Sequence, residues 1–507
     1  MSNIDAGKRL FAEGRLRRGQ RRLARRPVRL AAVACAVGAA VGCAVNPVTG
    51  ERELALISEA QEVAMGQEAA GQVAQSIGLV QNESLQEYVN GVGLALAAGS
   101  ERPELPWQFR VVDDPTPNAF ALPGGYIYVT RGLMSLLTSE AELAAVLGHE
   151  IGHVTARHSV SQLSRAQLAQ LGLGLGAILS PEIAQFGDLL GSGLQLLFLK
   201  YGRDDERQSD ELGFRYMLNQ GYDVSEMADV FRALLAAGEQ AGQSPLPTWL
   251  ASHPSEPERI ENAEQRVAAL TERTADARVG AEPYLDALDG TIYGENPRNG
   301  FFRDDWFYHP ELIFRFRVPS DWQRQNLPAA VQAVSPEQDA AVQLSIVPRE
   351  VGAGPVDAAN AFLSQQGIMP IGSTRDELNG KPAVISEFRV EEQGGAIRGY
   401  VAHIAHGDAT YQLITYAPEQ AFRARAGQLQ EIVSSFSDVR DRDILDVQPR
   451  RVEVVVLPRA MTLGEFAREY PSSAPMEELA LINQIDNVDA SIPAGTRLKR
   501  ITGERVG

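Results

Sequence analysis

The hydrophobic pattern between residues 139 and 154 predicts a buried amphipathic helix. Apolar side chains recur there at intervals of three and four positions: Leu143, Val146, Leu147 and Val154. This spacing places them on one face of a helix. Ser139, followed three positions later by Glu142, matches the capping-box pattern of a helix start. We therefore expect a helix that begins at Ser139.

A second helix is expected over residues 201–213. Glu206, Ser209, Asp210 and Gly213 occupy positions i, i+3, i+4 and i+7 of this segment, so they share one helical stripe. The small residues of the stripe permit a close approach to the first helix. A charged surface helix is the alternative interpretation, since acidic clusters are common on solvated faces.

Alternating hydrophobic and polar residues predict strands in two other parts of the chain. Gly124-Gly125 followed by Tyr126–Val129 is typical of a turn that enters a strand, and residues 107–112 are its expected neighbour. The second part contains five alternating segments and a closing helix: 312–318, 342–347, 383–388, 400–406, 411–416 and 421–436. The fold class is therefore α+β.

A length of 507 residues predicts about three domains. The expected division is a leader (1–42), a mainly helical domain with a small sheet (43–275), a linker (276–300), an α+β accessory domain (301–440) and a small C-terminal domain (451–504). A Gly- and Leu-rich insertion near 160–200 is interrupted by Pro181 and Glu182, which argues against a membrane-spanning helix. A mobile flap over an active site and a buried helical hairpin both fit this insertion.

The run His149-Glu-Ile-Gly-His153 on the first helix indicates a metal site. Residues four apart lie one above the other, so both imidazoles can point at one ion. A catalytic zinc ion takes three protein ligands and keeps one position open for an activated water. Glu150 would be the general base that takes a proton from this water. The pattern predicts one zinc ion per chain and peptide-bond hydrolysis; two core histidines beside a solvated Glu are the alternative.

The second helix would supply the rest of this site. Glu206 would complete a His-His-Glu ligand set. Asp210, one turn further on, would accept the outer N–H of a zinc-bound histidine and fix its tautomer.

These motifs together resemble the zinc metallopeptidases of peptidase family forty-eight, which includes the CAAX prenyl proteases and the periplasmic beta-barrel assembly-enhancing protease. The matching segments occur in the family's order over roughly residues 43–275: 46–50, 57–59, 118–129, 149–153, 203–210, 252–254 and 259–260. Ser209 stands where the family usually has Ala. The resemblance implies a gluzincin-like fold, Glu206 as third ligand, endopeptidase activity, and an edge strand that pairs with the substrate backbone.

His253 is a further candidate site residue. In proteins that this chain resembles, the His-Pro loop can reach the zinc, either as an autoinhibitory fourth ligand or near the developing oxyanion. The residues themselves say only that a His before Pro is extended or in a turn, and a surface loop histidine remains the alternative. His158 lies about one turn beyond His153, and we expect it to point further round the helix and to be structural.

The C-terminal segment 451–501 resembles a LysM repeat, a module that binds the N-acetylglucosamine glycans of cell walls. The resemblance rests on four segments: 452–457, 462–466, 478–483 and 492–499. Arg459-Ala-Met461 replaces the usual Gly-Asp before the first Thr-Leu. Recruitment to peptidoglycan and a structural cap therefore both remain open.

The N-terminus indicates the compartment. Residues 1–30 carry ten Lys or Arg and two acidic residues, and the apolar run 30–42 is too short to span a bilayer but fits a signal-peptide core. Ala40-Val-Gly-Cys43 resembles a lipobox, which predicts cleavage before Cys43 and lipidation of its thiol. Ala44 is not the Asp of an inner-membrane retention signal, so we expect an outer-membrane anchor facing the periplasm. An ordinary cleaved leader and a basic tail are the alternatives.

Charge and cysteine content agree with this compartment. Both cysteines, Cys35 and Cys43, lie in or directly after the leader, so the mature chain would have no disulfide. Removal of residues 1–42 deletes ten basic and two acidic residues and moves the net charge from −18 to −26. A surface this acidic argues against nucleic acid as a partner.

The expected function is that of a zinc-dependent endopeptidase of the bacterial cell envelope. Its expected substrates are misfolded or misassembled envelope polypeptides, including outer-membrane proteins. A chaperone-like or scaffold lipoprotein with a closed zinc site, and a cell-wall-associated hydrolase, are the alternatives. The presence of Glu150 favours the endopeptidase, because a pure binding protein has no need of a general base.

Overall fold

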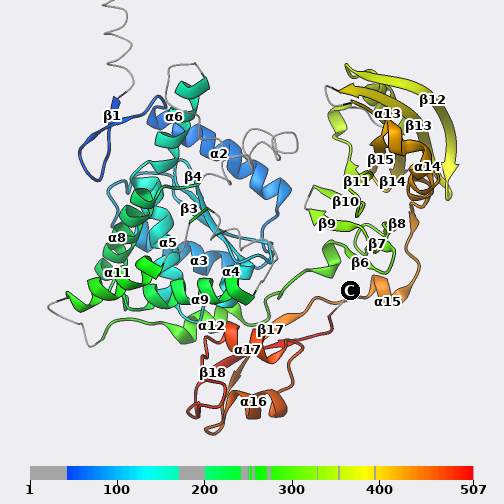
Figure 1. Ribbon diagram of the computed structural model, residues 1–507. Helices are drawn as coiled ribbons and strands as arrows, with labels where there is room; N and C mark the ends of the chain where they lie inside the picture. The colour runs from blue at the N-terminus through cyan, green and yellow to red at the C-terminus, as the bar shows by residue number, and fades with distance from the viewer. Residues whose placement is uncertain are drawn as a thin grey trace, which may run out of the picture.

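The computed structural model describes residues 43–170, 200–240, 249, 252–253, 257–270 and 276–505, apart from 328, 352–353 and 393–394. The expected leader and most of the expected insertion, residues 171–199, lie outside the described residues. Figure 1 shows a mainly helical body, a C-terminal unit beside it and a separate sheet-rich unit. No helix among the described residues is long and apolar enough to cross a membrane.

The first body is built around one buried helix, α5 (Glu140–Thr155), all of whose residues are buried. Ser139 caps this helix, as expected, by accepting a hydrogen bond from the N–H of Glu142. The Glu142 carboxylate accepts from the N–H of Thr138 instead of that of Ser139, so the capping box is not completed. Helix α5 packs most extensively against α3 (Glu83–Ala97), α8 (Arg203–Asn219), α9 (Glu226–Gln240) and β4 (Ala119–Leu122).

A three-stranded sheet covers another side of α5. Its order is β3 (Gln108–Val112), β5 (Tyr126–Thr130), β4, with β3 parallel and β4 antiparallel to β5. The expected pairing of residues 107–112 with 126–129 is therefore confirmed. Gly124 and Gly125 take positive φ angles in the turn between β4 and β5, which glycine adopts without strain. Helix α2 (Glu59–Ser76) packs on the other face of this sheet through Ala69 and Val73.

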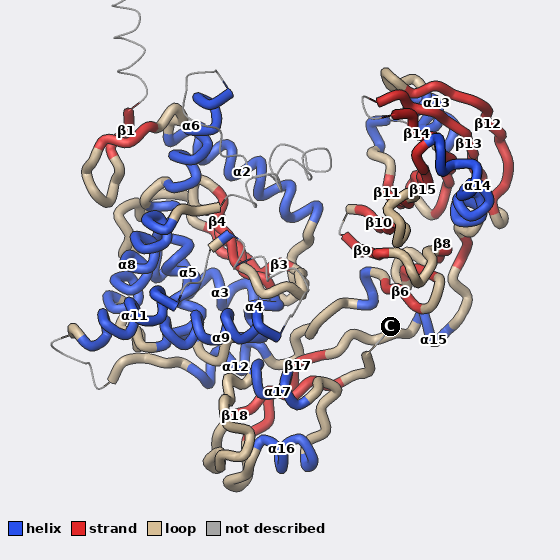
Figure 2. Tube along the Cα trace, viewed as in Figure 1, coloured by secondary structure: helices blue, strands red, loops and turns tan. Residues whose placement is uncertain are grey.

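The sheet-rich unit confirms the expected strands of residues 301–440 and adds others. A seven-stranded antiparallel sheet has the order β12, β13, β14, β15, β11, β10, β9 (Figure 2). Its strands are β9 (Gln323–Leu327), β10 (Ala330–Val334), β11 (Ala341–Ile346), β12 (Ile368–Leu378), β13 (Lys381–Glu392), β14 (Gly395–His406) and β15 (Ala409–Pro418). The closing helix is α14 (Glu419–Ser434), and α13 (Pro355–Leu363) lies between β11 and β12. A smaller four-stranded sheet has the order β16 (Ser437–Asp438), β8 (Phe314–Arg317), β7 (Trp306–His309), β6 (Phe301–Arg303).

The expected linker 276–300 is partly a folded element of the helical body. It contains α12 (Ala281–Leu288), where Tyr284 and Leu288 are almost fully buried. The composition of residues 285–300 suggested a linker, but the apolar residues of α12 find partners in the tertiary core.

The C-terminal unit has the element order strand, helix, helix, strand. Its elements are β17 (Arg451–Val456), α16 (Leu463–Glu469), α17 (Met476–Ile482) and β18 (Arg497–Thr502), and the two strands pair antiparallel. Its apolar residues belong to the same core cluster as those of α5. The LysM resemblance itself stays a prediction.

Candidate metal centre

His149 and His153 lie side by side on the buried helix α5. Their Nε2 atoms are 3.0 Å apart, and both side chains are 2% exposed or less. The helical repeat brings these nitrogens together, because positions four apart share a face. The sequence prediction for these two residues matches their placement.

The crossing of α5 and α8 depends on small residues in both helices. A Cβ atom added to Gly213 would lie 2.9 Å from the backbone nitrogen of His149, and one added to Gly152 would lie 2.9 Å from the Cα of Ser209. Real Cβ contacts are not this short, so only glycine permits this separation. The close crossing places Glu206 beside both histidines.

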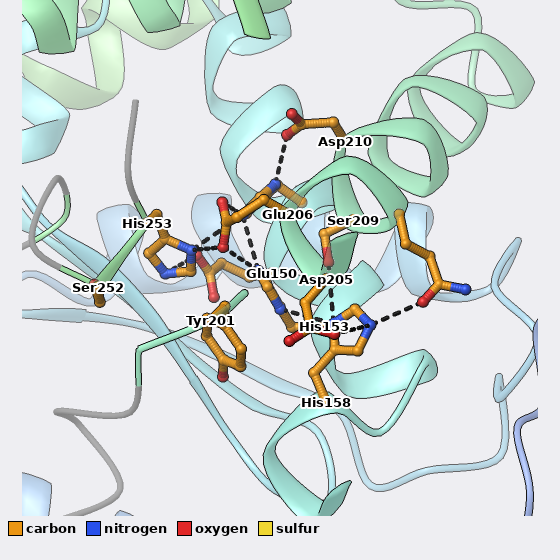
Figure 3. Close-up of polar contacts among 12 residues, drawn as sticks. Glu150, His153, His158, Tyr201, Asp205, Glu206, Ser209, Asp210, Ser252 and His253 are labelled. Atoms are coloured by element: carbon orange, nitrogen blue, oxygen red, sulfur yellow. Dashed lines mark hydrogen bonds and ion pairs between the residues drawn. The ribbon is translucent and has the colours of Figure 1, made fainter. Parts of the chain in front are cut away.

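Four side chains, on three segments, point their polar atoms at one small volume: His149, His153, Glu206 and His253. Figure 3 shows His253, Glu150 and Glu206 converging there. From His253 Nδ1 the distances are 3.2 Å to His149 Nε2 and 3.0 Å to Glu206 Oε1. Glu206 oxygens lie 3.5 Å from His149 Nε2 and 3.4 Å from His153 Nε2.

These separations fit a zinc ion. Ligands about 2.0–2.1 Å from a tetrahedral zinc stand roughly 3.3 Å from one another. The measured separations run from 3.0 to 3.5 Å. Two imidazoles and a carboxylate are also the donor set of a known type of catalytic zinc site. His253 supplies a fourth donor where such a site keeps an open position.

Asp210 and Arg259 fix the orientation of His149 through Nδ1, the ring nitrogen that points away from the cluster. Asp210 Oδ1 is 2.8 Å from His149 Nδ1, and Arg259 donates to both oxygens of Asp210 at 2.8 and 2.6 Å. Burial opposes ionisation of Asp210, but Arg259 and His149 outweigh it and lower the pKa of this carboxyl. Arg259 Nη1 also lies 3.0 Å from Glu206. The sequence did not indicate this role of Arg259, because the residue stood out there only as part of the matching segment 259–260.

His253 lies at the centre and not on the surface, with 1% of the residue exposed. Its N–H donates to the carbonyl of Trp249 at 2.7 Å, and its ring stacks on that of Trp249 at 5.1 Å. The alternative of a surface loop histidine is therefore wrong. The hydrophobic pattern of the sequence does not indicate this placement, because His253 lies on a separate segment, 104 positions from His149.

Glu150 is fully buried beside the cluster. Neither of its carboxylate oxygens has a hydrogen-bond partner among the described residues, and Oε1 is 3.5 Å from His253 Nε2. A buried carboxylate without hydrogen bonds is costly, so such a residue is a candidate for a chemical role.

His158 contacts the site, contrary to the expectation that it points away. Its Nδ1 lies 2.9 Å from His153 Nδ1. The expectation assumed a continuous helix, whereas α5 ends at Thr155 and a new helix, α6 (His158–Gln170), begins at His158. Tyr201, which the sequence did not single out, stacks on His153 with ring centroids 3.7 Å apart.

Comparison with known proteins places this geometry in a family. The model of peptidase family M48 matches residues 83–267, which include all four clustered side chains. The mitochondrial metalloendopeptidase OMA1 of Schizosaccharomyces pombe is 30% identical over 48% of this chain and 72% of that protein. The beta-barrel assembly-enhancing proteases of Yersinia pestis and Escherichia coli are 31% and 27% identical, over 47% and 43% of this chain. The chain covers 50% and 46% of these two relatives, about half their length.

Among solved structures, the cyanobacterial PsbP protein of Synechocystis matches 26% of this chain and 91% of that chain, at 13% identity and a TM-score of 0.22. A likeness this low carries no argument about function. The family match and the OMA1 match agree with the buried His-His-Glu cluster and its fit to zinc. The chain therefore belongs to peptidase family M48 and is a zinc metallopeptidase.

Proposed function

We propose that this protein is a zinc-dependent endopeptidase of the bacterial cell envelope that degrades misfolded or misassembled envelope proteins. The observation that carries the proposal is the fully buried Glu150, whose carboxylate has no hydrogen-bond partner among the described residues, next to the His149, His153 and Glu206 cluster. Burial of a carboxylate that accepts no hydrogen bond costs free energy, and a binding protein would have no reason to retain such a residue. The names of the beta-barrel assembly-enhancing relatives support the envelope assignment.

Each residue of the site has a separate role in this proposal. His149, His153 and Glu206 bind one zinc ion, which when bound polarises the peptide carbonyl and activates water for attack. Glu150 takes the proton from the attacking water and passes it to the leaving amine. Asp210 accepts the Nδ1–H of His149 and so keeps the Nε2 lone pair of that ring available.

We further propose that β4 binds the substrate backbone. It is one of the two edge strands of its sheet, and it contacts α5. Backbone pairing is indifferent to most side chains, so cleavage would be broadly specific. All four residues of β4 are buried, which supports a closed resting state.

His253 is the proposed gate of this closed state. Its Nδ1 completes the four-donor cluster at 3.0–3.2 Å from Glu206 and His149, so a zinc ion would have no position left for water. The rival role, stabilisation of the oxyanion, predicts the opposite effect of removing the ring. His253→Ala should raise proteolysis, including self-cleavage, if His253 is a gate. It should lower the rate about 10²- to 10³-fold if His253 is an oxyanion donor.

A histidine elsewhere in the chain provides the control for this assay. His309 lies in β7, outside the peptidase body, so His309→Ala should leave proteolysis unchanged. Wild-type activity in His253→Ala would reject both roles.

The anchor and the cell wall are separate parts of the proposal. The lipobox-like run before Cys43 supports a lipoprotein in the outer membrane, facing the periplasm. Radiolabelled palmitate should enter the wild type and not Cys43→Ala; labelling of both would reject the anchor. A pull-down of the full-length protein on purified peptidoglycan, with N-acetylglucosamine oligomers as competitor, tests the LysM-like unit; absence of binding would reject it.

A chaperone-like lipoprotein with a permanently closed zinc site is the second candidate, favoured by the buried His253 and β4. Digestion of unfolded casein, with and without a zinc chelator, separates the two candidates. An endopeptidase loses cleavage in chelator and regains it with added zinc, and Glu150→Gln abolishes cleavage while it retains zinc. A chaperone prevents casein aggregation and leaves the casein intact.

A further inference from the structure

A sharp bend between helices α5 and α6 brings His158 back to the metal centre. Helix α5 ends at Thr155, and Arg157 takes a left-handed conformation with φ of 60°. A non-glycine residue in this region costs free energy and persists only where its surroundings hold it. The Arg157 side chain donates to Glu62 at 2.9 Å and to the carbonyl of Ile57 at 2.9 Å. These contacts fix the bend after which α6 starts at His158.

The bend creates a directed chain of hydrogen bonds. A histidine that offers its Nε2 lone pair to a metal must carry its proton on Nδ1. His153 Nδ1–H then donates to His158 Nδ1 at 2.9 Å. His158 in turn carries its proton on Nε2, which lies 2.8 Å from Gln208 Oε1, an acceptor. Every donor in this chain therefore meets an acceptor.

We propose that His158, held by Gln208, is the positioning residue of His153. It accepts the Nδ1–H of His153 and so fixes the tautomer and the ring orientation that present Nε2 to zinc. The inference rests on the ligand role of His153 proposed above. It assigns to His153 what Asp210 supplies to His149, with a neutral imidazole in place of a carboxylate.

The surroundings of both rings favour this role over simple packing. His158 is 4% exposed, and its ring meets that of His153 edge-on at 73°, with the two Nδ1 atoms 2.9 Å apart. Tyr201 stacks on the face of His153, and its hydroxyl lies 2.9 Å from Ser159 Oγ, next to His158 in the chain. The ring of His153 is thus held at its edge by one residue and on its face by another.

Helix α8 supplies the outer partners of both histidine ligands. Asp210 contacts His149 directly, and Gln208 contacts His153 through His158. Glu206, two positions before Gln208, is the carboxylate of the cluster. Any shift of α8 would therefore change all three zinc ligands together.

Zinc affinity tests the proposal without reference to activity. The full chain carrying Glu150→Gln, which avoids self-cleavage, is titrated with zinc against a chelator of known affinity. His158→Phe keeps the ring shape and removes the acceptor, so the zinc Kd should rise about 10- to 100-fold. His158→Asn places an amide oxygen near the former Nδ1 and should restore most of the affinity.

Two further variants keep the test decisive. Gln208→Met removes the nearer of the two acceptors beside His158 Nε2, at 2.8 Å, and leaves Asp205 Oδ1 at 3.7 Å, so it should raise the zinc Kd by a smaller factor than His158→Phe. His403→Phe removes a buried histidine of β14, in the sheet-rich unit, and should leave the zinc Kd unchanged. The Tm of each metal-free variant shows whether it folds.

The proposal is overturned if His158→Phe folds and binds zinc as tightly as the parent, or if His158→Asn is as weak as His158→Phe. If His158→Phe does not fold, an unchanged zinc Kd in Gln208→Met overturns it. Casein cleavage by the wild type reports on the proposed function, and the zinc Kd reports on His158, so the two failures are distinguishable.

Discussion

At the scale of single residues, the centre combines groups whose burial would be unfavourable alone. Burial opposes the charge of Glu206, but the neighbouring His253 and His149 outweigh it and hold the pKa of this carboxyl well below its usual range. Burial likewise lowers the pKa of His153. An anionic Glu206 and a neutral His153 are the protonation states that metal binding requires.

The different placement of Glu206 and Asp210 predicts different losses of zinc. Glu206→Ala removes a donor atom, so the purified protein should contain little zinc. Asp210→Ala removes only the partner of His149 and should weaken zinc binding about 10- to 100-fold. Metal analysis and chelator competition measure both. Glu211→Ala is the matched control on the exposed side of α8 and should contain as much zinc as the wild type. Zinc content equal to wild type in Glu206→Ala would move the ligand elsewhere, to Asp205.

At the scale of elements, the crossing of α5 and α8 sets the site. The two helices touch where Gly148 meets Gly213 and where Gly152 meets Ser209. The sequence predicted the small-residue stripe on α8, while the matching glycines of α5 lie within the zinc motif itself. One pair of helices therefore provides both histidines, the carboxylate and Asp210.

Gly213→Ala tests whether this separation matters. The added methyl group would lie 2.9 Å from the backbone of His149, which cannot yield as a side chain can. We expect a loss of stability of about 1–3 kcal/mol and weaker zinc binding, because α8 must move away. Gly91→Ala in α3 is the control, since its Cβ would meet nothing within 4 Å. The control should be neutral or stabilising by up to about 1 kcal/mol, and equal Tm changes in the two variants would contradict the argument.

At the scale of the whole molecule, the C-terminal unit is attached to the helical body by buried contacts. Lys499 donates to the carbonyls of Ser135 and Leu137 at 2.8 and 2.7 Å, and Gln484 donates to that of Leu136 at 3.3 Å. These carbonyls lie at the C-terminal end of helix α4 (Arg131–Leu136), where intrahelical partners are lacking. The C-terminal unit thus supplies hydrogen-bond donors for the last carbonyls of α4, just before α5 begins.

The sheet-rich unit is inserted between these two parts. The chain leaves the body near Tyr293 and returns near Arg450, and the N–H of Tyr293 donates to the carbonyl of Arg450 at 2.8 Å. Ile292 and Arg451 form an antiparallel bridge beside them. The two connections to the inserted unit therefore run side by side.

This arrangement predicts opposite results for two deletions. Replacement of residues 297–448 by a short Gly-Ser linker should leave a folded, zinc-binding protein, because the joined ends are already adjacent. Truncation after residue 449 should strongly lower the Tm, because each core side chain left exposed costs roughly 1.5–3 kcal/mol. Thermal unfolding and zinc content of both proteins check this. A stable truncated protein would show that the C-terminal unit is an independent module.

The Glu142 and Lys499 pair predicts a pH dependence of stability. Burial raises the pKa of Glu142 to about 7 and lowers that of Lys499 to about 7. A raised carboxyl pKa removes stability as pH rises from about 4.5 to 7, and a lowered lysine pKa restores stability as pH rises from about 7 towards 10.5. The contribution of the pair to the free energy of unfolding should therefore have a minimum near neutral pH.

A double variant isolates this contribution. Subtraction of the Tm profile of Glu142→Gln/Lys499→Met from that of the wild type, between pH 5 and 9, should give a curve with a minimum near pH 7. Arg459→Met/Glu469→Gln removes an exposed ion pair of the same unit and should give a nearly flat difference. A flat difference for the buried pair as well would mean that its pKa values are not shifted.

The sequence by itself determined the local parts of this protein. Periodicity located α5, α8 and the main strands of the sheet-rich unit, and the spacing of His149, Glu150 and His153 indicated the chemistry. These features follow from residues close together in the chain, which a helical or alternating repeat places in space without further information.

Only the tertiary structure decided which distant residues join the site. His253 enters from a loop 104 residues after His149, and Arg259 from the helix that follows it. His158 returns because Glu62 and Ile57 hold the bend at Arg157, and Lys499 reaches α4 across more than 360 residues. No local repeat encodes these contacts, because each depends on how separate elements share one core.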